Sequence, residues 1–250
     1  MMSKLLRLAL VAVLISAASI TALAQRGGYR SSSSYSGNVP YDGRFVFVRM
    51  SYPWGQRQQP PWAHDYQEGE INFLKIMQSV TNVPLHLDGT SIMSFSDPEI
   101  FKNPVIYLCE PGYWQMSDDD VKSLRTYMLK GGFMILDDFP DWAWANTDLQ
   151  MSRVFPDLHW VDLTTEHPIF HSFFEINSFD IIPQYYMHGR PIFRGLFEGN
   201  DPKKRMYAVA NYNTDISEFW EHSALGFRPV AENNEAFKLG INEFVYGITH

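Results

Sequence analysis

The sequence predicts an α/β fold: a three-layer sandwich with a mainly parallel sheet, followed by a C-terminal hairpin and helix. Three observations support it. Residues 105–108 are a short apolar run, typical of a strand buried on both faces. Residues 121–128 repeat apolar side chains at helical spacing. Residues 133–136 are a second apolar run directly after Gly131 and Gly132, so the segment indicates one β-α-β unit.

The ends of this central helix are marked in the sequence. Ser117 is a residue type that caps helices, and residues 118–120 are three aspartates in the first turn, where the helix dipole favours negative charge. Gly131 can adopt the left-handed conformation that ends a helix at little cost. The sequence therefore predicts a helix between the two strands.

Apolar periodicity and turn residues predict the other elements in order. Before the central unit we expect a strand at 44–50, a long loop at 51–66, a helix at 68–80, a short strand at 85–87 and a helical turn at 97–101. After it we expect a helix at 148–155, a strand at 159–163, a turn or short helix at 167–171, strands at 191–198 and 206–212 joined by a hairpin-type connection, a mixed loop at 213–228 and a final helix at 235–249.

The first residues are typical of an export signal. Lys4 and Arg7 precede an apolar segment at 8–15, and residues 22–24 are a small-x-small cleavage site, which predicts a signal peptide over residues 1–24. The processed chain is then periplasmic or secreted and not an integral membrane protein. An uncleaved membrane anchor is the alternative interpretation.

Residues 25–40 are rich in Gly and Ser and predict a flexible leader, which leaves residues 41–250 as one folded domain. Cys109 is the single cysteine, so no internal disulfide can form. The formal net charge of −8 argues against nucleic acid as a partner.

The chain resembles the bacterial domain of unknown function 4159, and more distantly the class I glutamine amidotransferase-like, or flavodoxin-like, fold and its trehalose-utilisation-like relatives. The resemblance covers residues 44–250. Its motifs are Ser51-Tyr-Pro-Trp-Gly55, Pro61-Trp-Ala-His-Asp-Tyr66, Glu110-Pro-Gly112, Gly131-Gly-Phe133, Asp137-Asp-Phe139, His167-Pro-Ile-Phe170, Lys238-Leu-Gly-Ile-Asn242 and Tyr246-Gly-Ile-Thr-His250. The resemblance implies a partner role in an envelope protein complex. We expect no cofactor.

The sequence departs from the amidotransferase pattern at the nucleophile. That reaction needs a cysteine at a sharp strand-to-helix elbow. Here the expected strand ends in Leu136-Asp137-Asp138, and Cys109 is followed by Glu110-Pro111, which is no elbow. We therefore interpret Cys109 as a small buried side chain and expect no glutaminase activity.

Acidic residues follow two neighbouring strands of the predicted sheet. Glu110 follows the first strand of the central unit, and Asp137 and Asp138 follow the second. Ligands of parallel sheets bind beyond the carboxyl ends of strands. Adjacent residues of a strand point in different directions, so at most one of the two aspartates faces the crevice. It can bind a cation or sugar hydroxyls or act as an acid or base; a helix cap with a salt bridge is the alternative.

His64 and Asp65 lie in the first long loop, which shares the same crevice in the predicted fold. Together with Asp138, Glu110 and His222 they can form a metal or acid–base cluster. The spacing matches no recognised metal signature, so we assign no metal site. Capping of the following helix is the alternative role of Asp65. Arg49 and Arg57 are the candidate internal counter-ions of the acidic group, and a divalent ion is the alternative if neither arginine reaches it.

Aromatic residues gather in these same loops, which suggests a surface for stacking on sugar or peptide. They are Tyr52, Trp54, Trp62, Tyr66, Tyr113, Trp114, Trp142 and Trp144. A second small hydrophobic core that closes the loops over the sheet is the alternative.

Two functions therefore compete. The first is an exported, envelope-associated binding domain for a partner protein or a cell-wall or glycan ligand, with Tyr52, Trp54, Asp65, Glu110, Tyr113, Trp114, Trp142 and His222 as binding residues. The second is a hydrolase of glycan or another envelope polymer, with Asp137, Asp138 and His64 as catalytic residues.

Overall fold

A computed structural model describes residues 37–55, 59–180 and 189–250. The expected signal peptide at 1–24 and most of the leader lie outside these residues, as does Arg57. The described chain has a seven-stranded sheet in the order β2-β1-β3-β4-β7-β6-β5. Its strands are β1 (Val48–Ser51), β2 (Ser91–Ser94), β3 (Val105–Cys109), β4 (Phe133–Phe139), β5 (Trp160–Asp162), β6 (Ile192–Phe197) and β7 (Met206–Tyr212).

The sheet is mostly parallel. Strands β2, β1, β3, β4 and β7 pair in parallel, while β6 pairs antiparallel with both β7 and β5. The expected α/β class, the parallel β-α-β unit and the C-terminal hairpin are confirmed. Because parallel strands run in one direction, the carboxyl ends of β1, β3 and β4 lie at the same edge of the sheet.

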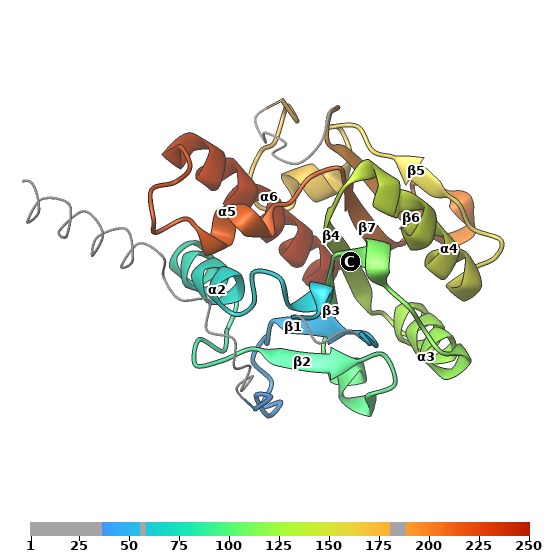
Figure 1. Ribbon diagram of the computed structural model, residues 1–250. Coiled ribbons are helices and arrows are strands. Elements are labelled where there is room, and N and C mark those ends of the chain that lie inside the picture. Colours follow the sequence, from blue (N-terminus) through green and yellow to red (C-terminus); the bar gives the residue numbers. More distant parts are fainter. Residues whose placement is uncertain (1–36, 56–58, 181–188) are drawn as a thin grey trace, which may run out of the picture. The chain divides into compact units, whose positions relative to one another are not determined.

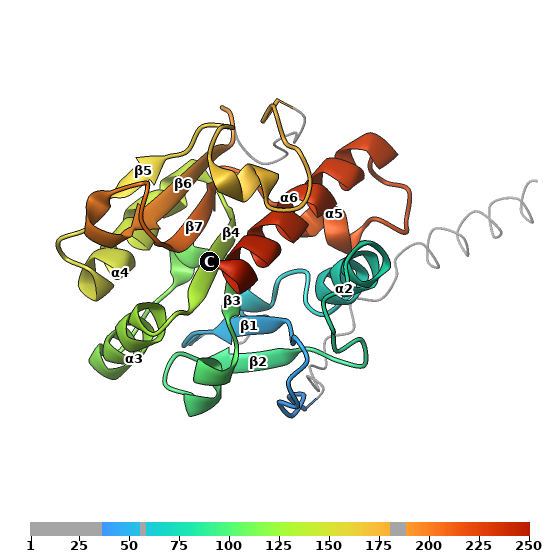
Figure 2. The ribbon, with the colours of Figure 1, turned by 180° about the vertical axis from the view of Figure 1, so that it is seen from behind.

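Five α-helices are described: α2 (Glu68–Val80), α3 (Asp118–Leu129), α4 (Trp144–Val154), α5 (Ser217–Glu221) and α6 (Val230–Thr249). Helices α2, α5 and α6 lie on one side of the sheet and α3 and α4 on the other (Figures 1 and 2). Ser117 caps the start of α3, as the sequence indicated, and it also forms a reciprocal capping box with Asp120. Helix α2 has the predicted bounds.

Aromatic rings fill the core between strands β1 and β3 and the helices α2, α5 and α6. Phe244 on α6 packs on Phe47, Phe73 and Tyr107, with ring centroids 4.9 to 6.5 Å apart. Trp220 on α5 lies 4.5 Å from Phe73. Such rings are worth about 0.5–1.5 kcal/mol per pair beyond their buried area. This core fixes α2 and α5 against the carboxyl ends of the strands.

Several expected elements differ in their bounds, since β1 begins at Val48, α4 at Trp144 and α6 at Val230, and two differ in kind. Residues 85–87 form no strand; Leu85 makes one isolated bridge to Phe45, and the second strand is β2, at Ser91–Ser94. The sequence Ser91-Ile-Met-Ser94 has only two large apolar residues, so its pattern was too short to identify. The expected mixed loop at 213–228 contains the short helix α5, and the N–H of Glu218 in its first turn donates to Asp215.

Candidate functional site

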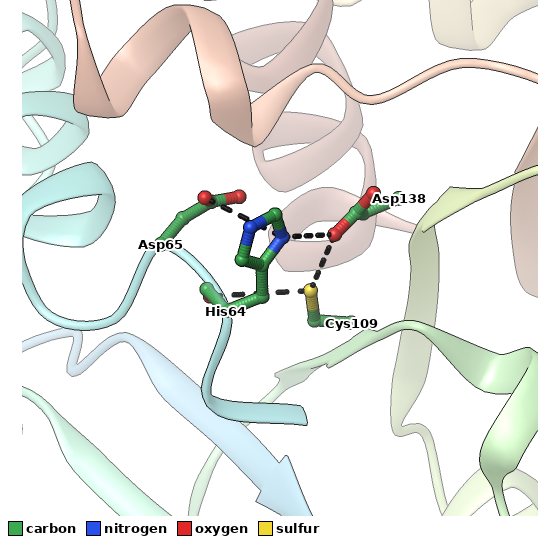
Figure 3. Close-up of side chains that lie close together, drawn as sticks. All are labelled: His64, Asp65, Cys109 and Asp138. Atoms are coloured by element: carbon green, nitrogen blue, oxygen red, sulfur yellow. Dashed lines mark hydrogen bonds and ion pairs between the residues drawn. The ribbon is translucent and has the colours of Figure 1, made fainter. Parts of the chain in front are cut away.

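His64 and Asp138 meet at the carboxyl edge of the sheet (Figure 3). Nδ1 of His64 lies 2.9 Å from Oδ2 of Asp138, 3.6 Å from Oδ1 of Asp65 and 3.6 Å from Oε1 of Glu110. The Cys109 thiol donates to the same Asp138 oxygen at 3.2 Å. Segments that are far apart in the sequence thus place one imidazole among three carboxylates and a thiol.

A buried arginine positions the loop that carries His64. Arg49 on β1 forms a fully buried salt bridge with Glu70 on α2. Its Nη1 also donates to the carbonyl oxygens of Trp62, at 3.0 Å, and of His64. The short 3₁₀ helix η1 (Pro61–Ala63) is therefore tied to both β1 and α2 immediately before the histidine. Arg49, one of the two candidate counter-ions, thus forms its ion pair with Glu70 and acts on Glu110 only through its charge.

Three acidic residues of the site have left-handed backbones. The φ angles are 60° at Asp65, 49° at Glu110 and 56° at Asp138. Positive φ is uncommon outside glycine, and each such residue costs about 1–3 kcal/mol, which persists where the surrounding structure enforces it. At Asp138 it accompanies an irregular register between β4 and β7. Strain of this kind clusters at functional sites.

The charges of the site shift its proton affinities. The hydrogen bond to Asp138 raises the pKa of His64 to about 10. Burial, with the charge of Asp138, raises the pKa of Glu110 to about 7 and raises the pKa of the Cys109 thiol well above its ordinary value. Burial likewise raises the pKa of Asp65 well above its ordinary value. The site holds more acidic groups than its surroundings neutralise.

The Asp137 carboxylate points away from this cluster, towards neighbouring strands and the start of α5. Its carboxylate accepts hydrogen bonds from the Tyr107 hydroxyl at 2.6 Å, from Asn211 Nδ2 at 3.1 Å and from the N–H groups of Ile216 and Ser217 at 3.1 and 3.2 Å. Burial raises its pKa to about 6, against the effect of these donors. Of the adjacent aspartates, Asp138 therefore faces the cluster, and Asp137 joins β4 to the segment after β7.

The segment after β7 adds acidic residues that the sequence reasoning did not select. The Ser217 hydroxyl lies 2.9 Å from Oδ2 of Asp65 and 3.0 Å from Oδ1 of Asp215, so it joins two fully buried acids. Glu243 on α6 accepts from Asn211 Nδ2 at 3.3 Å. Asp215 and Ser217 follow the carboxyl end of a parallel strand, which is the signal that could have found them.

A pocket of about 230 Å³ opens beside His64. Its polar wall is formed by His64, Glu110 and Asp138, and its other walls by Gly112, Tyr113, Pro140, Trp142 and Ala143. These walls come from η3 (Pro111–Tyr113) after β3 and η4 (Asp141–Ala143) after β4. A Cβ at Gly112 would lie 2.5 Å from Cβ of Ala143, so glycine is needed for the two turns to approach this closely.

The loop aromatics divide into two groups. Trp54, Tyr113 and Trp142 form a row of edge-to-face contacts with centroids 5.6 and 5.5 Å apart, and Tyr113 and Trp142 are 40% and 53% exposed. The second group is packed inside the protein. Trp114 is fully buried and stacks on Phe95, and the buried Tyr52 donates its hydroxyl to the carbonyl of Glu110 at 2.8 Å.

The remaining aromatics pack near these groups. Trp62 is buried in η1, and the Tyr66 hydroxyl lies 3.0 Å from that of Thr90. Trp144 packs on Trp160 and Tyr212, with Arg194 over its ring at 4.1 Å. The loop aromatics therefore divide into residues that pack inside the protein and an exposed row that contains Tyr113 and Trp142.

His222 is not among the residues that line this pocket. It lies on the chain just after α5, where its Nε2 is 3.6 Å from Glu218 and 3.4 Å from Glu221. Of the eleven residues selected from the sequence, the structure brings His64, Asp65, Glu110, Asp138, Tyr113 and Trp142 to one place, with Trp54 in contact with Tyr113.

Within the part of the chain that the structure describes, no helix is both long enough and apolar enough to cross a membrane. Residues 44–248 match the family described as "Domain of unknown function (DUF4159)". The match spans most of the chain, so the chain belongs to this family. The comparison with curated proteins finds no match.

Proposed function

We propose that the chain is an exported, envelope-associated binding domain whose pocket takes a carbohydrate ligand. One observation carries the proposal: the pocket has an exposed aromatic wall, Tyr113 and Trp142, and a polar wall, His64, Glu110 and Asp138. A sugar ring presents an apolar face of C–H groups and a rim of hydroxyls. The two walls match these two parts of one ligand.

The exposure of the aromatic row supports binding over packing. Trp142 is 53% exposed, although the buried Trp114 in the neighbouring turn shows that this region can enclose an indole. A ligand in the pocket can cover the exposed indole of Trp142 and so remove apolar surface from water, which contributes about 25 cal/mol of binding free energy per Å². A ring stacked on Trp142 would also lie next to the carboxylates of Glu110 and Asp138, which accept hydrogen bonds from hydroxyls.

The proposal extends to fold and location. The parallel order of β1, β3, β4 and β7 supports an amidotransferase-like three-layer sandwich. Cys109 ends β3 and Glu110, not the cysteine, occupies the strained position of the following turn, which supports the loss of the nucleophile elbow. The sequence of residues 1–24 supports export to the periplasm or beyond the cell.

A hydrolase of an envelope glycan is the second candidate, and the His64–Asp138 hydrogen bond favours it. A histidine oriented by a carboxylate at 2.9 Å, at the mouth of a pocket, is the arrangement of a general acid or base. In this reaction His64 would move the proton, Asp138 would hold the ring, and Glu110 would contact the substrate. Asp137 takes no direct part, since its carboxylate is buried among Tyr107, Asn211 and the start of α5.

Calorimetric titration with a panel of soluble cell-wall glycan fragments tests the proposal. We expect one fragment class to bind, and Trp142→Ala to weaken it about tenfold or more, because loss of an aromatic anchor costs about 2 kcal/mol. Phe227→Ala is the matched control: Phe227 is 70% exposed but is not among the residues that line this pocket. Equal binding by both variants would contradict the proposal.

The same fragments distinguish the two candidates. Product release by the wild type that disappears in Asp138→Asn, with unchanged glycan affinity and folding, would identify the hydrolase. Binding without any product supports the binding domain.

A further inference from the structure

The cluster of His64, Asp65, Cys109 and Asp138 offers four ligand atoms to one point (Figure 3). The atoms are Nδ1 of His64, Sγ of Cys109 and one carboxylate oxygen from each aspartate. All of them lie within 4.8 Å of one another. Three separate segments supply them: the loop after η1, the end of β3 and the end of β4.

The one hydrogen on Nδ1 of His64 cannot form good hydrogen bonds to both Asp138 and Asp65. Nδ1 of His64 has one hydrogen at most, and Asp138 Oδ2 at 2.9 Å receives it. Oδ1 of Asp65 lies 3.6 Å from the same nitrogen, is fully buried and has no hydrogen-bond partner among the described residues. A buried carboxylate oxygen without a partner costs several times more than one that is bound. It faces the ring nitrogen, where a second positive group would complete its environment.

The buried cation nearby is already used. Among the described residues, Arg49 is the one buried lysine or arginine, and its ion pair is with Glu70. The Ser217 hydroxyl reaches only the other oxygen of Asp65, at 2.9 Å. The oxygen that faces His64 is left for a ligand.

We propose that these four side chains bind one zinc-class transition-metal ion. Zinc binds thiolate at about 2.3 Å and imidazole or carboxylate at about 2.0–2.2 Å, so ligand atoms of a tetrahedral site lie about 3.3–3.8 Å apart. The separation of 3.6 Å lies within this range, those of 2.9 and 3.2 Å need a small expansion, and the remaining pairs, which lie within 4.8 Å, need a contraction of up to about 1 Å. The ion replaces the proton between His64 and Asp138, the thiol proton of Cys109 and the proton of Asp65 where that carboxyl is protonated, and all of these protons leave to solvent.

The chemistry of the ligands selects the metal. A thiolate and an imidazole with two carboxylates suit zinc, cobalt or iron, whereas calcium and magnesium take oxygen ligands. The site also has an open side, because the His64 side chain is 37% exposed and borders the pocket, with Glu110 3.6 Å from its Nδ1. The metal would thus be reached from the pocket that we assign to the glycan, yet its binding requires no glycan.

Zinc and cobalt titrations of the chelator-treated full chain test the inference. We expect one zinc ion per chain by calorimetry, and cobalt to give a thiolate-to-metal charge-transfer band in the near ultraviolet. Asp65→Asn keeps the volume and the contact to Ser217 but removes the free carboxylate oxygen. We expect it, and Asp138→Asn, to weaken zinc binding at least about tenfold. Cys109→Ser should abolish the cobalt band.

Glu221→Gln is the matched control, since Glu218, Glu221 and His222 form the other group of potential ligands that the described residues contain. We expect it to leave zinc affinity unchanged. Thermal melting without metal checks that each variant is folded. Added zinc should raise the melting temperature of the wild type and of Glu221→Gln, and should raise that of the ligand variants less. Three outcomes would each overturn the inference. They are the absence of stoichiometric zinc binding, a cobalt complex without the thiolate band, and zinc affinity that is lost in Glu221→Gln but kept in Asp65→Asn. Loss of glycan binding in Trp142→Ala is independent of all three outcomes.

Discussion

Asp137 and Asp138 are neighbours in the chain, yet their carboxylates lie in different environments. Asp138 Oδ2 lies 2.9 Å from His64 and borders the pocket, whereas Asp137 Oδ2 accepts from Tyr107 at 2.6 Å and from the N–H groups that begin α5. The strand alternation separates the two side chains, and the left-handed backbone at Asp138 accompanies it. One aspartate thus belongs to the candidate site and the other to the scaffold beneath it.

Isosteric amides at the two positions should therefore differ in stability. Asp137→Asn places an NH₂ group against donors that need an acceptor, and each donor left unsatisfied costs about 1–3 kcal/mol. We expect urea unfolding to show that loss for Asp137→Asn and a smaller change for Asp138→Asn. Equal destabilisation by the two substitutions would show that Asp138 is as structural as Asp137.

Arg49 should be essential to the loop that carries His64. Replacement by methionine leaves Glu70 buried without its partner and frees the carbonyls of Trp62 and His64, and breaking a buried pair costs about 3–5 kcal/mol. Chemical denaturation measures it. Arg44→Met is the control, because the Arg44–Asp42 pair is exposed and should be worth about 0–1 kcal/mol. A loss at Arg49 no greater than at Arg44 would refute the role.

His167 should make the protein less stable in acid. Burial, with the nearby His250, lowers the pKa of His167 to about 4 from 6.5. The unfolded chain therefore binds the proton first, so this contribution is complete above about pH 6.5 and is lost as the pH falls towards 4, by at most about 1.4 kcal/mol per pH unit. His167→Asn keeps a side-chain acceptor for the Ile169 N–H and should flatten this part of the unfolding profile. An unchanged profile would contradict it.

Glu243 should act in the opposite direction. Burial, with the charge of Asp137, raises the pKa of Glu243 well above 4.5. The stability that Glu243 contributes is complete below about pH 4.5, where the carboxyl is neutral in both the folded and the unfolded chain. As the pH rises above this value the unfolded chain loses the proton first, and the free energy of unfolding falls by at most about 1.4 kcal/mol per pH unit. Glu243→Gln keeps an acceptor for Asn211 and has no such loss. The variant should thus gain stability over the wild type between pH 5 and pH 8 in denaturant melts. A constant difference across this range would count against it.

The sequence predicted the parts of the fold that local physics determines. The Ser117 cap of α3, the full length of α2 and the buried strands β3 and β4 follow from capping residues and apolar periodicity. Strand β2 was missed because it is four residues long, and α5 because five residues show no helical period. Such short elements form through tertiary contacts.

For the site, the rule that parallel strands end at one edge was enough to group His64 with Glu110 and Asp138. It could not show that Arg49 pairs with Glu70, since these residues lie on different elements. Nor could it show that the Cys109 thiol contacts Asp138, because an apolar strand predicts burial and not the neighbour across it. Contacts between strands depend on register, which the chain order alone does not specify.

The location of the bound glycan tests the central claim most directly. Amide chemical-shift changes on adding the tightest-binding fragment should centre on Glu110–Tyr113, Pro140–Ala143 and His64. The rival location is the larger, mostly apolar groove of about 560 Å³ between α2 and α6, lined among others by Ile76, Phe237 and Ile241. Shifts confined to the His64 pocket are the expected result. Shifts confined to the α2–α6 groove would contradict the assignment of the site.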